Sequence, residues 1–304
     1  MNGSHGFNLF GSGVRVTSQV SVSAENTRRP LRGLILLAGV LACLGSPALA
    51  LDDTLDRGVL QFKTRFSTWG ADEYLDRDKI SIPLSGLSDY DDFTENRLDL
   101  DFAFGWGNGL TLVWNTSYVE REIEGPAGSI KTSGIDGVYA GVRQRLSGNL
   151  DGTRFMAETG IWYPAEADQN DPLPIEYEGL SWIFIMSYNQ TFYPTQGGFE
   201  MDFGYRFRNE DPEDEYFFDT SLNLQVMKIG YLKLHYHMVE SRKNSGSAFD
   251  VLEYATDRGR QTVGLDLFTD LGRRWRIDIG YQTTVNGRNV FDGDGAKLSL
   301  TWTR

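Results

Sequence analysis

The sequence predicts an all-β protein, a closed antiparallel transmembrane β-barrel of about twelve strands. Three observations predict it. Apolar and polar residues alternate in segment after segment, long acidic loops alternate with mostly short turns, and an export signal precedes the whole pattern. Successive side chains of a β-strand point to opposite faces, so each such segment has one apolar face and one polar face.

Residues 1–50 have the features of a secretory signal peptide. Basic residues precede an apolar run at residues 34–44, and Ala48-Leu49-Ala50 then supplies the small residues of a cleavage site. The run is too short to cross a membrane as a helix. We therefore expect cleavage after Ala50 and a barrel formed by residues 51–304. The polar stretch before the signal is unusually long, which a mis-called start codon would explain.

The composition excludes several classes of protein. The first 50 residues hold four Arg and one Glu, so the remainder keeps 25 basic and 41 acidic residues, a net charge of −16. Such a chain is poorly suited to nucleic acid or to an anionic inner-leaflet surface. The only cysteine is Cys43, and its lipidation is the alternative to cleavage after Ala50, although Leu41 fits a lipoprotein signal poorly. The predicted mature chain therefore has no disulfide, and no apolar stretch of about 20 residues that would form a transmembrane helix.

The first three strands are the clearest. Residues 60–68 alternate, and a long acidic loop follows at residues 70–93. Residues 97–106 and 110–118 then alternate on either side of Gly107-Asn108-Gly109, and Asn-Gly between alternating runs is a strong hairpin signal. This hairpin supplies the second and third strands.

The same alternation predicts nine further strands. They are expected at residues 138–145, 155–163, 180–188, 199–208, 218–226, 232–238, 263–267, 275–283 and 297–302. The expected loops are at residues 120–133, 164–178, 210–215, 240–259 and 286–295, and the short turns lie around Gly148-Asn149, at 228–230 and at 271–273. Every second connection therefore lies at one end of the structure, which is typical of outer-membrane barrels with short periplasmic turns and longer external loops.

The polarity of the two faces separates a membrane barrel from its alternative, a soluble periplasmic β-sandwich. The polar face carries charges of both signs, which suits a wet lumen better than a solvated outer surface. Aromatic residues lie near the ends of the apolar face, where interfacial girdles belong. They are Trp106, Trp114, Tyr118, Tyr163, Tyr205, Trp275, Tyr281 and Trp302.

Two segments carry a resemblance to a known family. TSGIDGVYAGVRQRL at residues 132–146, with WNTSYVER at 114–121, resembles the outer-membrane transporters associated with the phenol meta-cleavage pathway. Ser-Gly-Ile at 133–135 matches the turn of that family, Asp136-Gly137 reverses its Gly-Asp order, and two arginines keep its basic lumenal positions, Arg143 and Arg145. The resemblance covers about a quarter of the chain and implies a barrel that takes up solutes.

The polar face predicts a pore or transporter for passive uptake of small solutes. Opposite charges facing each other across a narrow wet lumen create a transverse field that selects among solutes. A barrel of this size has little bore once side chains fill it, so permeation is selective or the lumen is plugged. The predicted lumen-lining, solute-contacting residues are Lys63, Arg65, Arg97, Asp99, Asp101, Arg143, Arg145, Arg154, Glu158, Glu200, Asp202, Arg206, His235, His237 and Asp278.

Two histidines carry the alternative reading. His235 and His237 share the polar face, which suits the base of an outer-membrane lipid-modifying hydrolase with Ser221 or Ser299 as nucleophile, or a metal site. We favour the simpler interpretation that both histidines are polar side chains that fill the lumen, because no catalytic signature accompanies them. A structural or adhesive barrel that acts through its loops is the third reading. No catalytic residues, cofactor or metal site is predicted, and an enzyme is the less favoured outcome.

The expected location is the outer membrane of a diderm bacterium, after Sec-type export and removal of the signal peptide. The expected partners are outer-membrane lipids, lipopolysaccharide and a small-molecule solute, with no nucleic acid. Acidic loops suit Ca²⁺ or Mg²⁺ that bridge lipopolysaccharide, although solvated loops are the simpler reading. The sequence does not define the solute or the oligomeric state.

Overall fold

The structure, a computed structural model, describes residues 54–76, 78–87, 90–126, 128–147, 152–165, 179–192, 197–209, 214–227, 230–241 and 259–304. The predicted signal peptide lies outside these residues, as do the predicted turn around Gly148-Asn149 and most of the predicted loops at 164–178, 210–215 and 240–259. No helix in the described ranges is long and apolar enough to cross a membrane.

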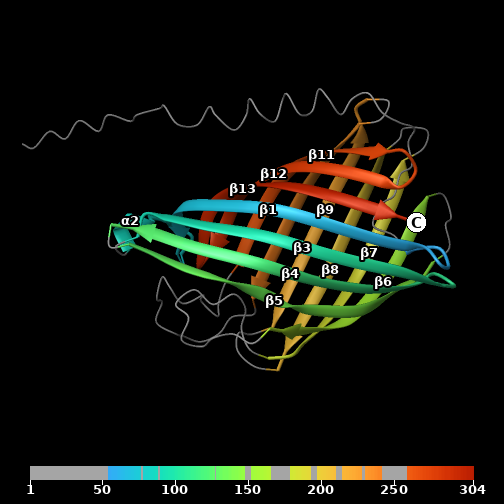
Figure 1. Ribbon diagram of the computed structural model, residues 1–304, viewed down its shortest axis with the longest axis horizontal. Coiled ribbons are helices and arrows are strands. Elements are labelled where there is room, and N and C mark those ends of the chain that lie inside the picture. Colours follow the sequence, from blue (N-terminus) through green and yellow to red (C-terminus); the bar gives the residue numbers. More distant parts are fainter. Residues whose placement is uncertain are drawn as a thin grey trace, which may run out of the picture. The chain divides into compact units, whose positions relative to one another are not determined.

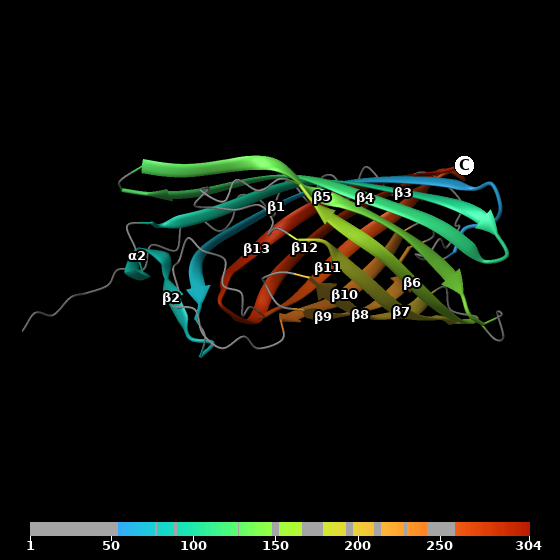
Figure 2. The same cartoon turned by 90° about the horizontal axis from the view of Figure 1, so that it is seen from below.

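Twelve long strands form one antiparallel sheet in which each strand pairs with the next along the chain (Figures 1 and 2). They are β1 (Leu60–Leu75), β3 (Asp92–Gly107), β4 (Leu110–Gly125), β5 (Gly128–Arg145), β6 (Thr153–Pro164), β7 (Ser181–Phe192), β8 (Gly197–Arg208), β9 (Glu215–Gln225), β10 (Gly230–Ser241), β11 (Gly259–Leu271), β12 (Trp275–Arg288) and β13 (Val290–Thr303). A short strand, β2 (Ser81–Pro83), pairs with the end of β1, and the one-turn helix α2 (Leu84–Leu87) follows it.

The sheet closes on itself through its first and last strands. β1 and β13 are antiparallel partners from Gln61↔Thr303 to Leu75↔Val290. Closure pairs the backbone of both terminal strands and leaves no exposed sheet edge between them. The predicted closed antiparallel barrel of about twelve strands is confirmed, and the β-sandwich alternative is excluded.

The two ends of the barrel differ. The turn end carries the tight connections after β3 and after β11, together with Arg304, and lies at the right in Figure 1. The loop end carries the long 76–91 connection with β2 and α2 as well as the tight connections after β4 and after β12, and lies at the left. At the predicted hairpin of the turn end, Asn108 has φ 54° and Gly109 has φ 73°. These left-handed conformations are the ones that an Asn-Gly turn requires.

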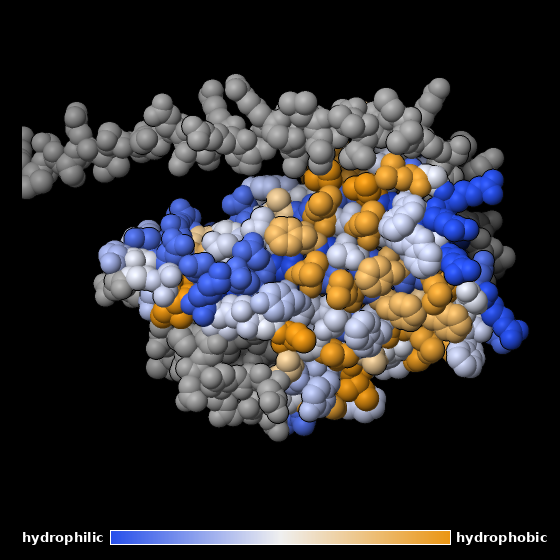
Figure 3. All heavy atoms as spheres, in the orientation of Figure 1, coloured by the Kyte–Doolittle hydropathy of each residue, from blue (hydrophilic) through white to orange (hydrophobic). Residues whose placement is uncertain are grey.

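The outward face of the strands is apolar. Large apolar side chains on one parity of each strand remain exposed, among them Phe66 (49%), Phe203 (52%) and Trp182 (55%). Figure 3 shows such side chains gathered over the middle of the visible face, with hydrophilic residues towards both ends. Six of the eight predicted girdle aromatics are large exposed residues, and Tyr205 and Trp302 are half-buried.

The prediction of a loop at residues 120–133 is wrong, because β4 and β5 continue through it as a hairpin. Val119 and Ile123 on the inward face are fully buried, whereas the outward positions are Glu120 and its acidic neighbours. This hairpin extends beyond the apolar band, so its outward face is charged. Charge on the outward face hid the alternation that the sequence otherwise displays.

The prediction of a loop at residues 286–295 is wrong for a different reason. β12 runs to Arg288 and β13 starts at Val290, so Asn289, with φ 53°, alone makes the connection. The glycines of this segment serve close packing. A Cβ on Gly293 would lie 2.0 Å from the backbone oxygen of Gly70 on β1. The glycines that made this segment look like a loop are needed where β13 packs closely against β1.

The predicted acidic loop at residues 70–93 is partly a strand, since β1 continues to Leu75. Inward-facing residues of this extension pack with Leu84 of α2, which is fully buried, into an apolar cluster. Phe93 stacks on Phe291 within it, with ring centroids 3.9 Å apart. The buried members are Trp69, Ala71, Tyr74, Leu84, Phe93, Ile123 and Phe291. We name them the loop-end cluster.

Candidate functional site

The inward face of the barrel is the candidate site. Polar and charged side chains occupy the parity opposite to the exposed apolar residues, and many are buried, including Asp99 (6%) and Glu158 (6%). All of the residues predicted to line the lumen lie on this inward parity: Lys63, Arg65, Arg97, Asp99, Asp101, Arg143, Arg145, Arg154, Glu158, Glu200, Asp202, Arg206, His235, His237 and Asp278. Their contact with a solute stays a prediction.

One cluster joins β1, β3 and β4. Arg65 Nε lies 3.0 Å from Asp99 Oδ2, and Arg97 Nε donates to Asp99 Oδ1 at 2.7 Å. Ser117 donates to the same Oδ1 at 2.7 Å and accepts from Arg97 Nη2 at 2.8 Å. Arg65 also reaches Asp101, with 3.7 Å between Nη2 and Oδ2. Two cations therefore share one buried carboxylate, which keeps its charge compensated.

Asp136 completes this cluster and was missed in the sequence. Its Oδ2 lies 2.7 Å from Arg97 Nη2, and the residue is 4% exposed. The register changes here, since Ser117 pairs with Gly137 while the next residue of β4 pairs with Ile135. Asp136 is therefore the extra residue of a β-bulge, a device that redirects a side chain. The bulge breaks the strict alternation on which the prediction relied, so the sequence pattern did not place Asp136 on the inward face.

A second cluster joins β5 and β6. Arg143 Nε donates to Glu158 Oε2 at 2.7 Å, and the Tyr139 hydroxyl donates to Oε1 at 2.8 Å. The Tyr139 ring lies against the wall, where a Cβ on Gly141 or Gly160 would come within 2.5 Å of it. Glycine at both positions makes room for the ring. Arg143 stands directly opposite Glu158 in the register, so this ion pair joins two neighbouring strands.

Strands β8, β9 and β10 carry two further ion pairs. Lys233 Nζ on β10 lies 3.0 Å from Glu200 Oε2 on β8, and Ser221 of the intervening β9 donates to the same oxygen at 2.8 Å. Arg206 Nη1 lies 3.8 Å from Glu215 Oε2. Its guanidinium stands over the Trp162 ring, 5.5 Å from the ring centre, a cation–π arrangement.

The two histidines contact acids and a lysine. His235 Nε2 lies 3.3 Å from Asp266 Oδ1 and 3.1 Å from Lys297 Nζ, and that lysine lies 2.9 Å from Asp266 Oδ2. His237 Nδ1 pairs with Asp219. Asp266 and Lys297 were not among the predicted site residues, although both stand on the polar parity of their strands. Their alternation was the signal that could have found them.

These contacts do not assemble the hydrolase alternative. Ser221 stands directly opposite His235 in the register, but its hydroxyl donates to Glu200. Ser299 stands opposite Arg65 and Asp278. Among the described residues, neither histidine forms a hydrogen bond with a serine, so the nucleophile–base pair that covalent hydrolysis needs is not formed there.

The remaining predicted lumen residues also point inward. Arg154, Asp202 and Asp278 each have interaction partners. Lys63 stands opposite Asp101 in the register, yet it forms no ion pair with the residues that the structure describes. No group of three or more His, Cys, Asp or Glu in the described part of the chain is arranged to hold a metal ion. The wall is thus a lining of mostly paired charges.

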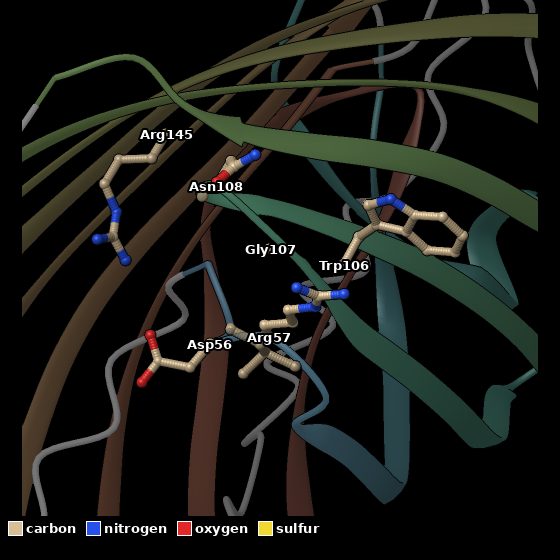
Figure 4. A pocket seen from close by; sticks show the side chains of 8 residues that line it. Asp56, Arg57, Trp106, Gly107, Asn108 and Arg145 are labelled. Atoms are coloured by element: carbon tan, nitrogen blue, oxygen red, sulfur yellow. The ribbon is translucent and has the colours of Figure 1, made fainter.

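The turn end of the barrel is hollowed. A depression of about 390 Å³ lies beside the connection between β3 and β4, with Asp56, Arg57, Asn108 and Arg145 in its lining. Figure 4 shows Arg145 and Asp56 on one side of this connection, whereas Trp106 points away from them. The chain segment that precedes β1 therefore contributes charged side chains to the mouth of the lumen.

Comparison with known proteins identifies the fold. No protein-family model and no curated protein sequence matches the chain. The chain is similar to the crystal structure of the COG4313 outer membrane channel from Pseudomonas putida F1, with TM-score 0.70 and 11% identity over 85% of this chain and 100% of that chain. It is also similar to the β domain of the Bordetella autotransporter BrkA, with TM-score 0.50 and 12% identity over 81% of this chain and 100% of that chain.

At these identities the likeness shows the fold alone, an outer-membrane type of barrel. The predicted link to the phenol meta-cleavage pathway stays a prediction.

Proposed function

We propose that this chain is an outer-membrane pore through which small solutes pass passively. The observation that carries the proposal is the inverted polarity of the barrel, with an apolar outward face and an inward face of hydrogen-bonded charges. A soluble barrel buries apolar side chains inside, whereas a membrane barrel exposes them to lipid and keeps a polar interior. The likeness to an outer membrane channel agrees with this reading.

The lining is suited to selective passage. Most described charges of the wall have a partner within 4 Å, as in Arg143–Glu158 and Lys233–Glu200, so the lumen has little net charge at those levels. Charged groups of both signs on a narrow wall give local transverse fields rather than one long attractive field. Such a wall favours small solutes that carry both hydrogen-bond donors and acceptors over large ions of either sign.

The orientation follows the usual plan of these barrels. Because longer connections of such barrels face outward, we assign the loop end, which carries the long 76–91 connection, to the outside and the turn end to the periplasm. The acidic outer connections then meet lipopolysaccharide and its divalent cations. The partners proposed at that end are outer-membrane lipids and lipopolysaccharide, and the proposed ligand of the lumen is the small solute that passes through it.

Two measurements test the proposal. The protein should fractionate with the outer membrane and migrate anomalously on a gel until it is boiled, because a closed barrel resists detergent. Purified protein in planar bilayers should then give discrete conductance steps. Folded, heat-modifiable protein that gives no conductance over many insertions would contradict the pore. Hydrolysis of phospholipid by that preparation, lost on His235→Ala, would instead favour the hydrolase.

A further inference from the structure

The chain enters the barrel before its first strand. Gly58 N–H donates to Gly105 O at 2.8 Å, and Gly105 N–H donates to Val59 O at 2.9 Å, so the β1–β3 ladder continues to this level. The chain then turns sharply, because Val59 N–H donates to Asp56 O at 3.0 Å and Gly58 has φ 81°. A positive φ at the third residue is the mark of a type II turn and is easily adopted by glycine.

This turn places residues 54–56 on the lumenal side of the wall. Gly105 belongs to the inward parity of β3, with Asp101 and Ala103. A Cβ added to Gly105 would lie 1.9 Å from the backbone oxygen of Asp56 and 2.8 Å from that of Leu55. Because an inward Cβ would collide with this backbone, the chain must cross the inner surface of β3.

Side chains of the next two strands hold the crossing segment. Leu55 N–H donates to Thr111 Oγ1 on β4 at 2.8 Å, and Thr111 is fully buried. Arg145 of β5 donates to Thr54 twice, from Nε to Oγ1 at 3.0 Å and from Nη2 to the backbone oxygen at 3.4 Å. Thr54 is only 5% exposed. A polar segment near the predicted mature terminus is therefore fastened across three strands.

We propose that residues 54–58 form a strap that constricts the turn end of the lumen and thereby limits which solutes pass. The inference rests on the proposed pore function and adds a specificity-determining element to it. The strap occupies space beside the wall that an open barrel would leave to water. It also brings Asp56 and Arg57 to the hollow at the mouth, so a passing solute meets charges that no barrel strand supplies.

The strap can lie against β3 only because residue 105 is a glycine, so substitution of Gly105 tests the proposal. Gly105→Ala puts a methyl group where the strap backbone now lies and should displace the strap without disturbing the strand. Gly70→Ala is the matched control, because a Cβ there would meet only Phe93 O, at 3.9 Å. Thr111→Val, which removes the hydroxyl that accepts from Leu55, is a second and milder way to loosen the strap.

The experiment uses the full chain in two readouts. First, Thr54→Cys introduces a single thiol into the predicted mature chain, and a soluble maleimide reports its exposure. We expect labelling to be about tenfold faster or more when Gly105→Ala is added, corresponding to the loss of about 1.4 kcal/mol of protection. Second, planar-bilayer recordings should show a larger single-channel conductance for Gly105→Ala and Thr111→Val than for wild type and Gly70→Ala.

The outcomes separate this inference from the pore itself. Unchanged labelling of Thr54→Cys by Gly105→Ala, in protein that is still heat-modifiable, overturns the strap. If Gly105→Ala speeds the labelling but its single-channel conductance equals that of wild type, the strap exists but does not constrict the lumen. If every variant is folded and none conducts, the pore proposal fails and the constriction fails with it, whereas the labelling result still reports where the strap lies.

Discussion

Lys297 Nζ lies 2.9 Å from Asp266 Oδ2, although the two residues belong to β13 and β11, which are not neighbours in the sheet. The intervening residue on β12 is Gly280, which stands opposite both. A Cβ on Gly280 would lie 2.0 Å from Asp266 Oδ1 and 2.6 Å from Lys297 Cε. The ion pair thus spans a strand because that strand has no side chain at this level.

Gly280→Ala should therefore weaken the barrel. The added methyl group must push the carboxylate and the lysine apart, and overpacking of this kind costs about 1–3 kcal/mol. The temperature at which the protein loses its compact gel mobility should fall. Gly70→Ala, whose added methyl group would make only an ordinary contact with Phe93 O at 3.9 Å, should leave that temperature unchanged. An equal fall in both variants would contradict the spanning pair.

The outward and inward faces of β8 should respond differently to substitution. Phe203→Arg places a cation on the apolar outward face, which costs roughly 2–4 kcal/mol near the middle of a bilayer. Arg206→Leu changes the inward face, where Arg208 Nη2 remains 2.6 Å from Glu215. Assembly into the membrane should drop for Phe203→Arg and persist for Arg206→Leu, as judged by heat-modifiable protein in membranes. Equal assembly would show that the faces are assigned wrongly.

Substitution of Lys63 and of Arg143 should have the same effect on ion selectivity but different effects on stability. Lys63→Gln and Arg143→Gln each remove one positive charge, so the reversal potential in a salt gradient should move towards cation preference in both. Arg143→Gln also leaves Glu158 buried without its cation, which costs roughly 3–5 kcal/mol, whereas Lys63 forms no ion pair within the described residues. Only Arg143→Gln should lower the unfolding midpoint in urea. The reverse order of stability would contradict the pairing.

The loop-end cluster predicts a local effect. Leu84→Ala removes a fully buried side chain and should cost about 2–5 kcal/mol of local packing. The 76–91 connection should then open, and trypsin should cut at the exposed Lys79 while the barrel stays heat-modifiable. Ile80, which is 59% exposed, supplies the control, since Ile80→Ala should leave the cleavage rate unchanged. Equal protection of both variants would mean that Leu84 does not hold this connection.

The architecture could be predicted because alternation is a local property. Phe203 and Asp202 take opposite faces whatever strands lie beside them, so each strand was recognisable in isolation. Alternation failed where the outward face left the apolar band, at Glu120, and where a bulge added a residue, at Asp136. Both failures have the same origin. The environment of the residue changes at these two positions, and the sequence alternation alone does not show that change.

The partners of the charges could not be predicted from the sequence. Arg97 meets Asp136, and Lys297 meets Asp266, only because the register of two consecutive strand pairs brings them to one level. A one-residue shift in either register would pair them differently. The path of the strap at residues 54–58 was even harder to predict. It depends on the absence of a side chain at Gly105, and Leu55 and Asp56, which a Cβ there would meet, are about fifty residues away in the sequence.

The seam between β1 and β13 has a kinetic consequence. Its partners, such as Gln61 and Thr303, stand at opposite ends of the barrel sequence, so nearly the whole chain must be present before the last pairing can form. Contacts of such high sequence separation form slowly, and until then the first strand keeps an unpaired edge that invites association with other chains. The newly exported chain must therefore be shielded through a long unclosed stage, and loss of its final strand would trap it there.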